Sequence, residues 1–355
     1  MTRPQRPFRC LALAFILAGC PGRESARDSA DAELEIAALD ANIIDAAGLD
    51  EIALADSSDA NSDIALAGDA LDAAADTQAD SAIAPDVEFD SGPEIPGTVR
   101  IIAGNLTSGT AQSYTPGHGI RIFQGLHPDI VLIQEFNYGT NTPVEHRAFV
   151  DMAFGPTFEY WRGTGDIPNG VISRYHIVAS GDWVDPYVAN RAFSWARINV
   201  PGAHDLWAIA VHLLSSGGTQ RANEATALVT HIHDNVPSDD LLVIGGDMNT
   251  ETRVEGCVAT LAVVVGVSAP YPTDETGNTN TNSPRARPYD WLLADSDLAA
   301  TEVPVMVGAG MFVHGLVFDS RVYSLLTDVA PVMASDSAAV NMQHMAVVRD
   351  FRLGF

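Results

Sequence analysis

The chain has 355 residues, with 46 Asp and Glu against 19 basic residues, all of them Arg, and a formal net charge of −27. So acidic a chain lacks the basic surface that tight, non-specific binding to bare nucleic acid requires. The charge does not exclude an enzyme that approaches phosphate groups through a bound divalent cation.

The first twenty residues have the features of a secretory leader. Three Arg precede an apolar run at residues 10–17, which is too short to span a bilayer comfortably. The sequence Leu-Ala-Gly-Cys ends at Cys20 and resembles the bacterial lipobox, which implies that Cys20 is acylated and begins the mature chain. An ordinary signal peptide with an incidental cysteine is the alternative. We expect an exported protein, lipid-anchored to the bacterial membrane, with the outer membrane or cell surface as the favoured location.

Residues 21–97 differ in composition from the rest of the chain. They contain twenty acidic residues and two Arg, and consist largely of Ala, Asp, Ser and Ile. Low complexity and like charge predict a mostly disordered, self-repelling segment. A coil of this length reaches roughly 50 Å, and further with charge repulsion. The expected organisation is a lipoprotein signal peptide at 1–20, an acidic tether at 21–97 and a folded catalytic domain at 98–355.

From residue 98 onward the pattern becomes that of an α/β domain. Apolar and alternating runs predict strands at 99–104, 130–134, 193–200, 206–213, 241–245 and 345–351. Helices are predicted at 120–126 and 220–235. Most strands carry polar or charged residues at their C-terminal ends, which predicts an α/β sandwich with active residues on the loops of one rim.

Cysteine usage is sparse. Cys10 lies in the leader and Cys20 is the expected lipidation site, so no intrachain disulfide is expected in the mature protein. Cys257 lies in an apolar run, which predicts a small buried hydrophobic residue.

Seven short motifs follow one another along the domain. They are Gly-Asn at 104–105, Gln-Glu at 134–135, Asn-Gly-Val-Ile-Ser-Arg at 169–174, His-Leu at 212–213, Gly-Asp-Met-Asn at 246–249, Tyr-Asp-Trp at 289–291 and Gln-His-Met at 343–345. Each is common by chance, but in this order they resemble the endonuclease/exonuclease/phosphatase (deoxyribonuclease I-like) superfamily. The resemblance spans residues 105 to 348. It implies a four-layer α/β sandwich of two packed mixed or antiparallel β-sheets flanked by helices, and a metal-dependent phosphoesterase.

Glu135 and Asn105 are the candidate metal ligands. Mg²⁺ prefers oxygen ligands and needs only one or two carboxylates besides water and substrate oxygens. Glu135 follows a buried strand in a chain without Lys, so a purely structural Glu at this position would need another partner. The resemblance places Asn105 beside it as a neutral oxygen donor. We therefore expect Mg²⁺, or Mn²⁺, as the cofactor.

The resemblance also assigns the catalytic residues. Asp247 positions or deprotonates the attacking water, and Asn249 contacts the phosphate, although an Asx-turn after Gly-Gly explains both residues equally well. His212 and His344 are residues that can donate a proton near neutral pH. Asp290 is expected to orient His344 and to favour its protonated form.

One position departs from the family pattern. Gln343 stands where an Asp usually precedes the last His, which removes a negative charge from the metal side, and Asp336 is too distant along the chain to replace it by alignment. A catalytically degenerate surface-binding domain is therefore the alternative of another class. Asn169 remains a candidate phosphate-binding residue, and Arg174 a structural one.

The substrate is the least determined feature. An extracellular nuclease acting on DNA or RNA is the first hypothesis. A phosphatase or a phospholipase C or sphingomyelinase-like hydrolase of small phosphoesters or lipids is the alternative, which the acidic domain slightly favours. The expected partners are a phosphoester substrate and the membrane, with no obligate protein partner.

Overall fold

The structure is a computed structural model that describes residues 97–108 and 112–354. The predicted leader, Cys20 and the predicted tether up to residue 96 lie outside the described residues. Within them, no helix is both long and apolar enough to cross a membrane.

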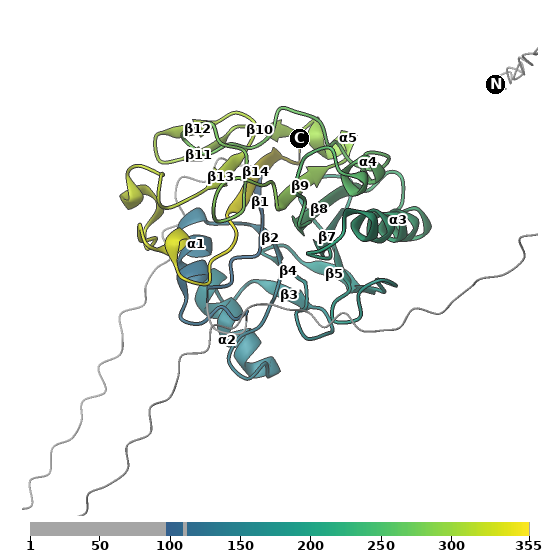
Figure 1. The fold of residues 1–355 in the computed structure, drawn as a ribbon, viewed down its shortest axis with the longest axis horizontal. Helices are drawn as coiled ribbons and strands as arrows, with labels where there is room; N and C mark the ends of the chain where they lie inside the picture. Colours follow the sequence, from purple (N-terminus) through teal and green to yellow (C-terminus); the bar gives the residue numbers. More distant parts are fainter. Residues whose placement is uncertain (1–96, 109–111, 355) are drawn as a thin grey trace, which may run out of the picture. The chain divides into compact units, whose positions relative to one another are not determined.

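The described residues form two β-sheets with helices on their outer faces (Figure 1). The first sheet has seven strands in the order β10-β14-β1-β2-β4-β3, with β13 also paired to β14. It is a mixed sheet, because β1 and β2 are parallel and the other pairs are antiparallel. Its strands are β1 (Thr98–Gly104), β2 (Ile130–Ile133), β3 (Glu159–Arg162), β4 (Gly170–Ser173), β10 (Glu302–Val303), β13 (Leu316–Phe318) and β14 (Ala346–Arg352).

The second sheet has five strands in the order β5-β6-β7-β8-β9. Only β7 and β8 are parallel within it. Its strands are β5 (Ile177–Trp183), β6 (Phe193–Ile198), β7 (Leu206–His212), β8 (Leu241–Asp247) and β9 (Asp290–Ala294). The remaining elements are a two-stranded sheet of β11 (Val305–Val307) and β12 (Gly310–Phe312), the helices α1 (His118–Leu126), α2 (Pro143–Phe154), α3 (Gly218–Asn235), α4 (Gly256–Leu261) and α5 (Ser296–Ala299), and the 3₁₀ turns η1 (Leu326–Val329) and η2 (Asp336–Ala338).

Side-chain alternation along the strands divides the interior into three apolar cores. In β1, Ile101 and Ala103 point into the core between the two sheets, whereas Ile102 points to the outer core beneath α1 and α2. A third core lies between the second sheet and α3 and α4, and includes Leu228 and Cys257. The result is a four-layer sandwich, which confirms the predicted fold.

The strands and helices predicted from apolar patterns are present, with bounds that differ by a few residues. Helix α2 was not predicted, although it begins with a capping box in which the Thr142 side chain accepts from the Glu145 N–H and the Glu145 carboxylate accepts from the Thr142 N–H. Cys257 is buried and free, as predicted, and burial raises the pKa of its thiol to about 11.

Two glycines allow β8 to approach the first sheet. A Cβ at Gly245 would lie within 3 Å of side-chain atoms of Leu132, Ala103 and Leu292, so only glycine fits between the sheets here. Gly246 has a φ of 138°, a conformation that L side chains rarely adopt. Because both directly precede Asp247, they determine how closely that carboxylate approaches β1 and β2.

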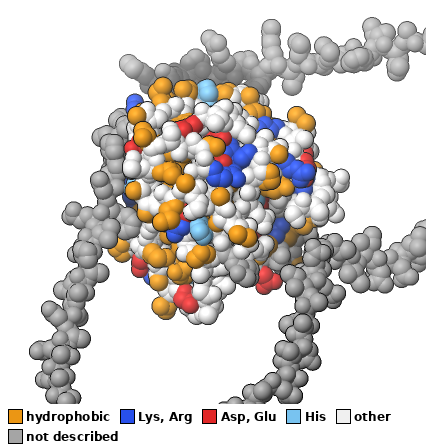
Figure 2. All heavy atoms as spheres, turned by 60° about the vertical axis from the view of Figure 1, so that its left-hand side comes forward, with side chains coloured by type: hydrophobic (Ala, Val, Ile, Leu, Met, Phe, Trp, Pro, Cys, Tyr) orange, Lys and Arg blue, Asp and Glu red, His pale blue; other side chains and the backbone are white. Residues whose placement is uncertain are grey.

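Hydrophobic side chains on the surface are spread over several patches, as the face in Figure 2 shows. The more exposed ones include Met311, Leu325 and Val340. Scattered apolar residues are usual on protein surfaces, so they do not by themselves mark a site.

Candidate active site

Strand pairing brings the predicted site residues to one edge of the sandwich. Parallel pairing makes β1 and β2 end together, and β7 and β8 end together. Because β9 and β14 run antiparallel to β8 and β1, they begin at this same edge. The six residues at these strand ends are all buried: Asn105, Glu135, His212, Asp247, Asp290 and His344.

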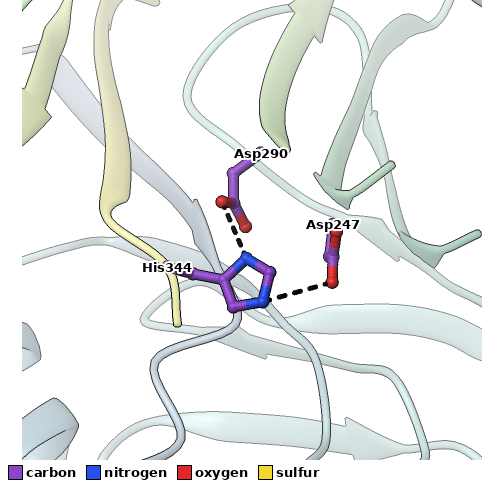
Figure 3. A group of neighbouring side chains, drawn as sticks. All are labelled: Asp247, Asp290 and His344. Atoms are coloured by element: carbon purple, nitrogen blue, oxygen red, sulfur yellow. Dashed lines mark hydrogen bonds and ion pairs between the residues drawn. The ribbon is translucent and has the colours of Figure 1, made fainter. Parts of the chain in front are cut away.

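His344 lies between two carboxylates (Figure 3). Its Nδ1 is 3.0 Å from Asp290 Oδ2 and its Nε2 is 3.4 Å from Asp247 Oδ2. Burial alone would favour the neutral ring, but the two carboxylates outweigh it and raise the pKa of His344 to about 10. The predicted pairing of Asp290 with His344 is thus present, and His344 carries a proton at neutral pH.

Asp247 is in contact with both histidines. Its Oδ2 lies 3.3 Å from His212 Nε2, in addition to the contact with His344. Burial raises the pKa of Asp247 to about 7, against the lowering effect of the positive charge on His344. Burial keeps the pKa of His212 well below its usual range, so His212 is neutral. Asp247 is therefore a carboxylate that exchanges a proton near neutral pH.

The segment after Asp247 is the Asx-turn that the sequence suggested. The Asn249 N–H donates to Asp247 Oδ1 at 2.9 Å, and Asn249 Nδ2 donates to the carbonyl of Leu213 at 3.0 Å. Asn249 and Glu135 each have a φ of 50°, in the left-handed region that non-glycine residues adopt infrequently. Two predicted site residues thus share a backbone conformation that is often found where function requires it.

Glu135 and Asn105 are in direct contact. Asn105 Nδ2 donates to Glu135 Oε1 at 2.7 Å, and Thr107 Oγ1 lies 3.2 Å from Glu135 Oε2 and 3.3 Å from Asn105 Oδ1. His212 Nδ1 is 4.0 Å from Glu135 Oε1 and has no hydrogen-bond partner among the described residues. In that same part of the chain no Arg pairs with Glu135. This set of oxygen donors around an uncompensated carboxylate fits a hard divalent cation.

A second group also has the spacing of metal ligands. Possible ligand atoms of Asp247, Asp290 and His344 all lie within 4.8 Å of one another. Both ring nitrogens of His344, however, face carboxylates, and a protonated imidazole offers no lone pair to a metal. The oxygens of Glu135 and Asn105 are therefore the donors at this edge whose chemistry better suits a hard cation.

The other predicted residues have different positions. Asn169 lies directly before β4, at the catalytic edge, and its Oδ1 is buried without a hydrogen-bond partner among the described residues. Gln343 is exposed, and only its main-chain carbonyl has a described contact, with the N–H of Ser283. Asp336 is buried and pairs with Arg121, so its carboxylate is already engaged away from the proposed ligand pair. Arg174 pairs with Asp129 at 2.9 Å, which agrees with a structural role.

Sequence reasoning missed two residues that hydrogen-bond to the main chain at and after His212. The buried Arg191 donates from Nε to the carbonyl of His212 at 2.6 Å and from Nη2 to that of Leu213 at 3.2 Å. Glu224, on the buried face of α3, accepts the N–H of Leu214 at 3.1 Å. Burial raises the pKa of Glu224 to about 8. The sequence signal for the burial of Glu224 was its helical spacing relative to the apolar residues of α3.

Thr281 was also missed. Its hydroxyl accepts the N–H of Asp290 at 2.6 Å, and its carbonyl accepts the N–H of Met345 at 2.7 Å. It therefore joins the start of β9 to the residue after His344. Since these contacts connect loops far apart in sequence, no local motif indicates them.

The sequence model of the Endonuclease/Exonuclease/phosphatase family matches residues 120–331. The chain belongs to this family. Its members hydrolyse phosphoester bonds, so the predicted family and the general reaction class are confirmed. A comparison of the sequence with curated proteins gave no match.

Two solved structures are similar to this chain. An endonuclease/exonuclease/phosphatase from Bacteroides vulgatus is 16% identical with a TM-score of 0.51, over 72% of this chain and 99% of that chain. The endonuclease/exonuclease/phosphatase from Beutenbergia cavernae is 18% identical with a TM-score of 0.48, over 72% of each chain. The first of these confirms the deoxyribonuclease I-like arrangement of two packed sheets.

The buried Glu224 predicts a pH-dependent stability. The pKa of Glu224 in the folded protein is about 8, above the ordinary value of 4.5. Its contribution to the free energy of unfolding is therefore fully present below pH 4.5 and is lost as the pH rises through about 8. We expect Glu224→Gln, which keeps an acceptor for Leu214, to raise Tm relative to the wild type more at pH 8 than at pH 5. Thermal unfolding measures this. The exposed Glu251→Gln serves as the control, and an equal effect of Glu224→Gln at both pH values would contradict the interpretation.

Proposed function

We propose that this chain is an exported, membrane-tethered, metal-dependent phosphoesterase that hydrolyses P–O bonds by an activated water, with nucleic acid as its substrate. The observation that carries the catalytic part is the position of Asp247. Its Oδ2 lies between His212 and His344 at the edge that also presents Glu135 and Asn105.

The protonation states of Asp247 and His344 indicate a different catalytic role for each side chain. Asp247, with a pKa of about 7, accepts a proton from a water molecule near neutral pH. His344 enters the reaction protonated and stabilises the negative charge that develops on the phosphoryl oxygens. Asp290 keeps the ring oriented through Nδ1, so that Nε2 faces the reacting groups. Asn249 and Asn169 supply neutral polar contacts to the phosphate.

Glu135 and Asn105 would hold the cation, with Mg²⁺ or Mn²⁺ as the expected ion. When bound, it would offset the charge of the phosphate and polarise its P–O bonds. The side chain of Gln343 is exposed and makes no hydrogen bond with the described residues, so the proposed ligand pair does not include it. The predicted ligand pair therefore does not depend on the family's usual Asp.

An aromatic ring beside His344 supports a nucleic-acid substrate. The half-buried ring of Tyr289 has its centroid 5.7 Å from that of His344. The exposed Arg287 lies next to it, with Nη1 3.4 Å from the Tyr289 hydroxyl. An aromatic face next to a phosphate-binding centre suits the stacking of a nucleobase, which every nucleotide offers whatever its sequence.

Metal-dependent turnover tests the catalytic proposal. The full chain should hydrolyse a member of the panel plasmid DNA, RNA, sphingomyelin and inositol phosphates with Mg²⁺ or Mn²⁺, and lose activity in a chelator. His344→Ala and His212→Ala should each lower kcat by about 10²-fold or more, since each removes a group that acts on the reacting centre. The exposed His204→Ala is the matched control and should retain activity. Absence of turnover on the whole panel would favour a degenerate binding domain. Full activity in both site variants would contradict the catalytic assignment of these histidines.

The substrate class has its own test. Tyr289→Ala should raise KM for DNA or RNA about tenfold, as loss of one base–aromatic stack of about 1–3 kcal/mol implies. Tyr289→Phe should retain the wild-type KM. Steady-state kinetics on an oligonucleotide and on an inositol phosphate measure the effect. Preferential turnover of sphingomyelin or inositol phosphate, with no change in KM for the oligonucleotide, would favour the small-phosphoester alternative.

The export proposal rests on the leader and Cys20. Cys20→Ser should move the protein from the membrane fraction to the soluble fraction, because it removes the acylation site. Fractionation followed by immunoblotting measures this. Unchanged membrane association of the variant would contradict lipid anchoring through Cys20.

A further inference from the structure

A cavity of about 420 Å³ lies beside β9, on the side of that strand that faces away from β8. Of the catalytic side chains, only Asp290 lies on its wall. The other walls come from the loop at 266–272, from Arg253 and from β13 and β14. Its volume is in the range of small-molecule binding sites in proteins.

Arg253 contributes a positive charge to this cavity, and no carboxylate among the described residues forms an ion pair with it. Its guanidinium carbon lies 4.0 Å from the ring centroid of Tyr271 and 4.7 Å from that of Trp291. Nη2 donates to the carbonyl of Thr279, and Nε and Nη1 have no hydrogen-bond partner among the described residues. Burial lowers the pKa of Arg253 to about 10, which agrees with a cation that is poorly compensated.

The second arginine on the wall differs. Arg349 pairs with Glu302, its Nε lying 2.8 Å from Glu302 Oε1, and donates from Nη1 to the carbonyl of Leu292 at 3.1 Å. Its charge is therefore already paired on β10, and its Nη1 joins β14 to β9. Because Asp290 is likewise engaged with His344, the charge that remains to be matched in the cavity is that of Arg253.

The rest of the wall is largely apolar. Val267, Leu292, Val317 and Val347 line it together with the rings that flank Arg253. Burying apolar ligand surface against such a wall is favourable, and a guanidinium pairs with carboxylate, sulfonate or phosphate through two parallel hydrogen bonds. Neither a bare inorganic ion nor a neutral hydrocarbon would satisfy both features.

We propose that this cavity binds a small organic anion, whose acidic group pairs with Arg253 and whose apolar body lies against Leu292 and Val317. The cavity adjoins the catalytic centre at Asp290, but Arg253, Leu292 and Val317 lie outside that centre. It does not depend on the phosphoesterase assignment, since the residues that would recognise the ligand take no part in catalysis.

A matched pair of probes tests the proposal in the full chain. Naphthalene-2-sulfonate and 2-naphthalenemethanol have the same apolar body, but only the first carries an acidic group. Isothermal titration calorimetry should show at least tenfold tighter binding of the sulfonate. Arg253→Met should abolish this preference, whereas Arg287→Met, which removes an exposed arginine outside the cavity, should preserve it.

A second variant tests, independently of Arg253, whether the probes bind in this cavity. Ala299 lies on the wall, and Ala299→Leu narrows the cavity without altering its charge. It should weaken both probes at least fivefold. Four results would each overturn the proposal. In the wild type these are failure to bind either probe, or equal affinity for the two. In the variants they are a preference for the sulfonate that survives in Arg253→Met, or unchanged affinities in Ala299→Leu. If Arg253→Met does not fold, the preference of the wild type for the sulfonate and the result for Ala299→Leu together decide the proposal.

Discussion

The close packing of β8 against the first sheet is the constraint on which the site depends. At Gly245 the two sheets approach until only a glycine fits, with Ala103 and Leu132 on the opposite side. Asp247 follows two residues later, so its carboxylate lies at the edge where β1 and β2 also end. A wider separation of the sheets would move Asp247 and His212, which end strands of the second sheet, away from Glu135, Asn105 and His344, which flank strands of the first sheet.

This packing concentrates negative charge in a buried place. Glu135, Asp247 and Asp290 are all less than about a tenth exposed, and the chain has no Lys to pair with them. The protein compensates in three ways: a protonated His344 between two of the carboxylates, the buried Arg191 behind His212, and donors such as Thr107 and Asn105 around Glu135. The compensation around Glu135 is made by neutral groups, which is why a cation is expected there and not beside Asp290.

The sequence predicted the parts of the fold in which the pattern is local. The buried runs at β1, β2, β7 and β8 are almost entirely apolar, so their strands were evident. Strands β3 and β5 were not, because they are partly exposed and show no clear alternation. The convergence of Asp247, Asp290 and His344 was predicted from ordered motifs. By contrast, the contacts of Arg191, Glu224 and Thr281 join segments that only the folded chain brings together; the helical spacing of Glu224 indicates its burial but not its partner.

The strand register of β1 has a consequence for how the domain meets its surroundings. Thr98 pairs with Arg352, so the start of β1 and the end of β14 lie together, whereas Asn105 lies past the other end of β1, roughly 20 Å away at the usual rise per residue. Whatever chain precedes Thr98 therefore joins the domain at the rim opposite the catalytic residues.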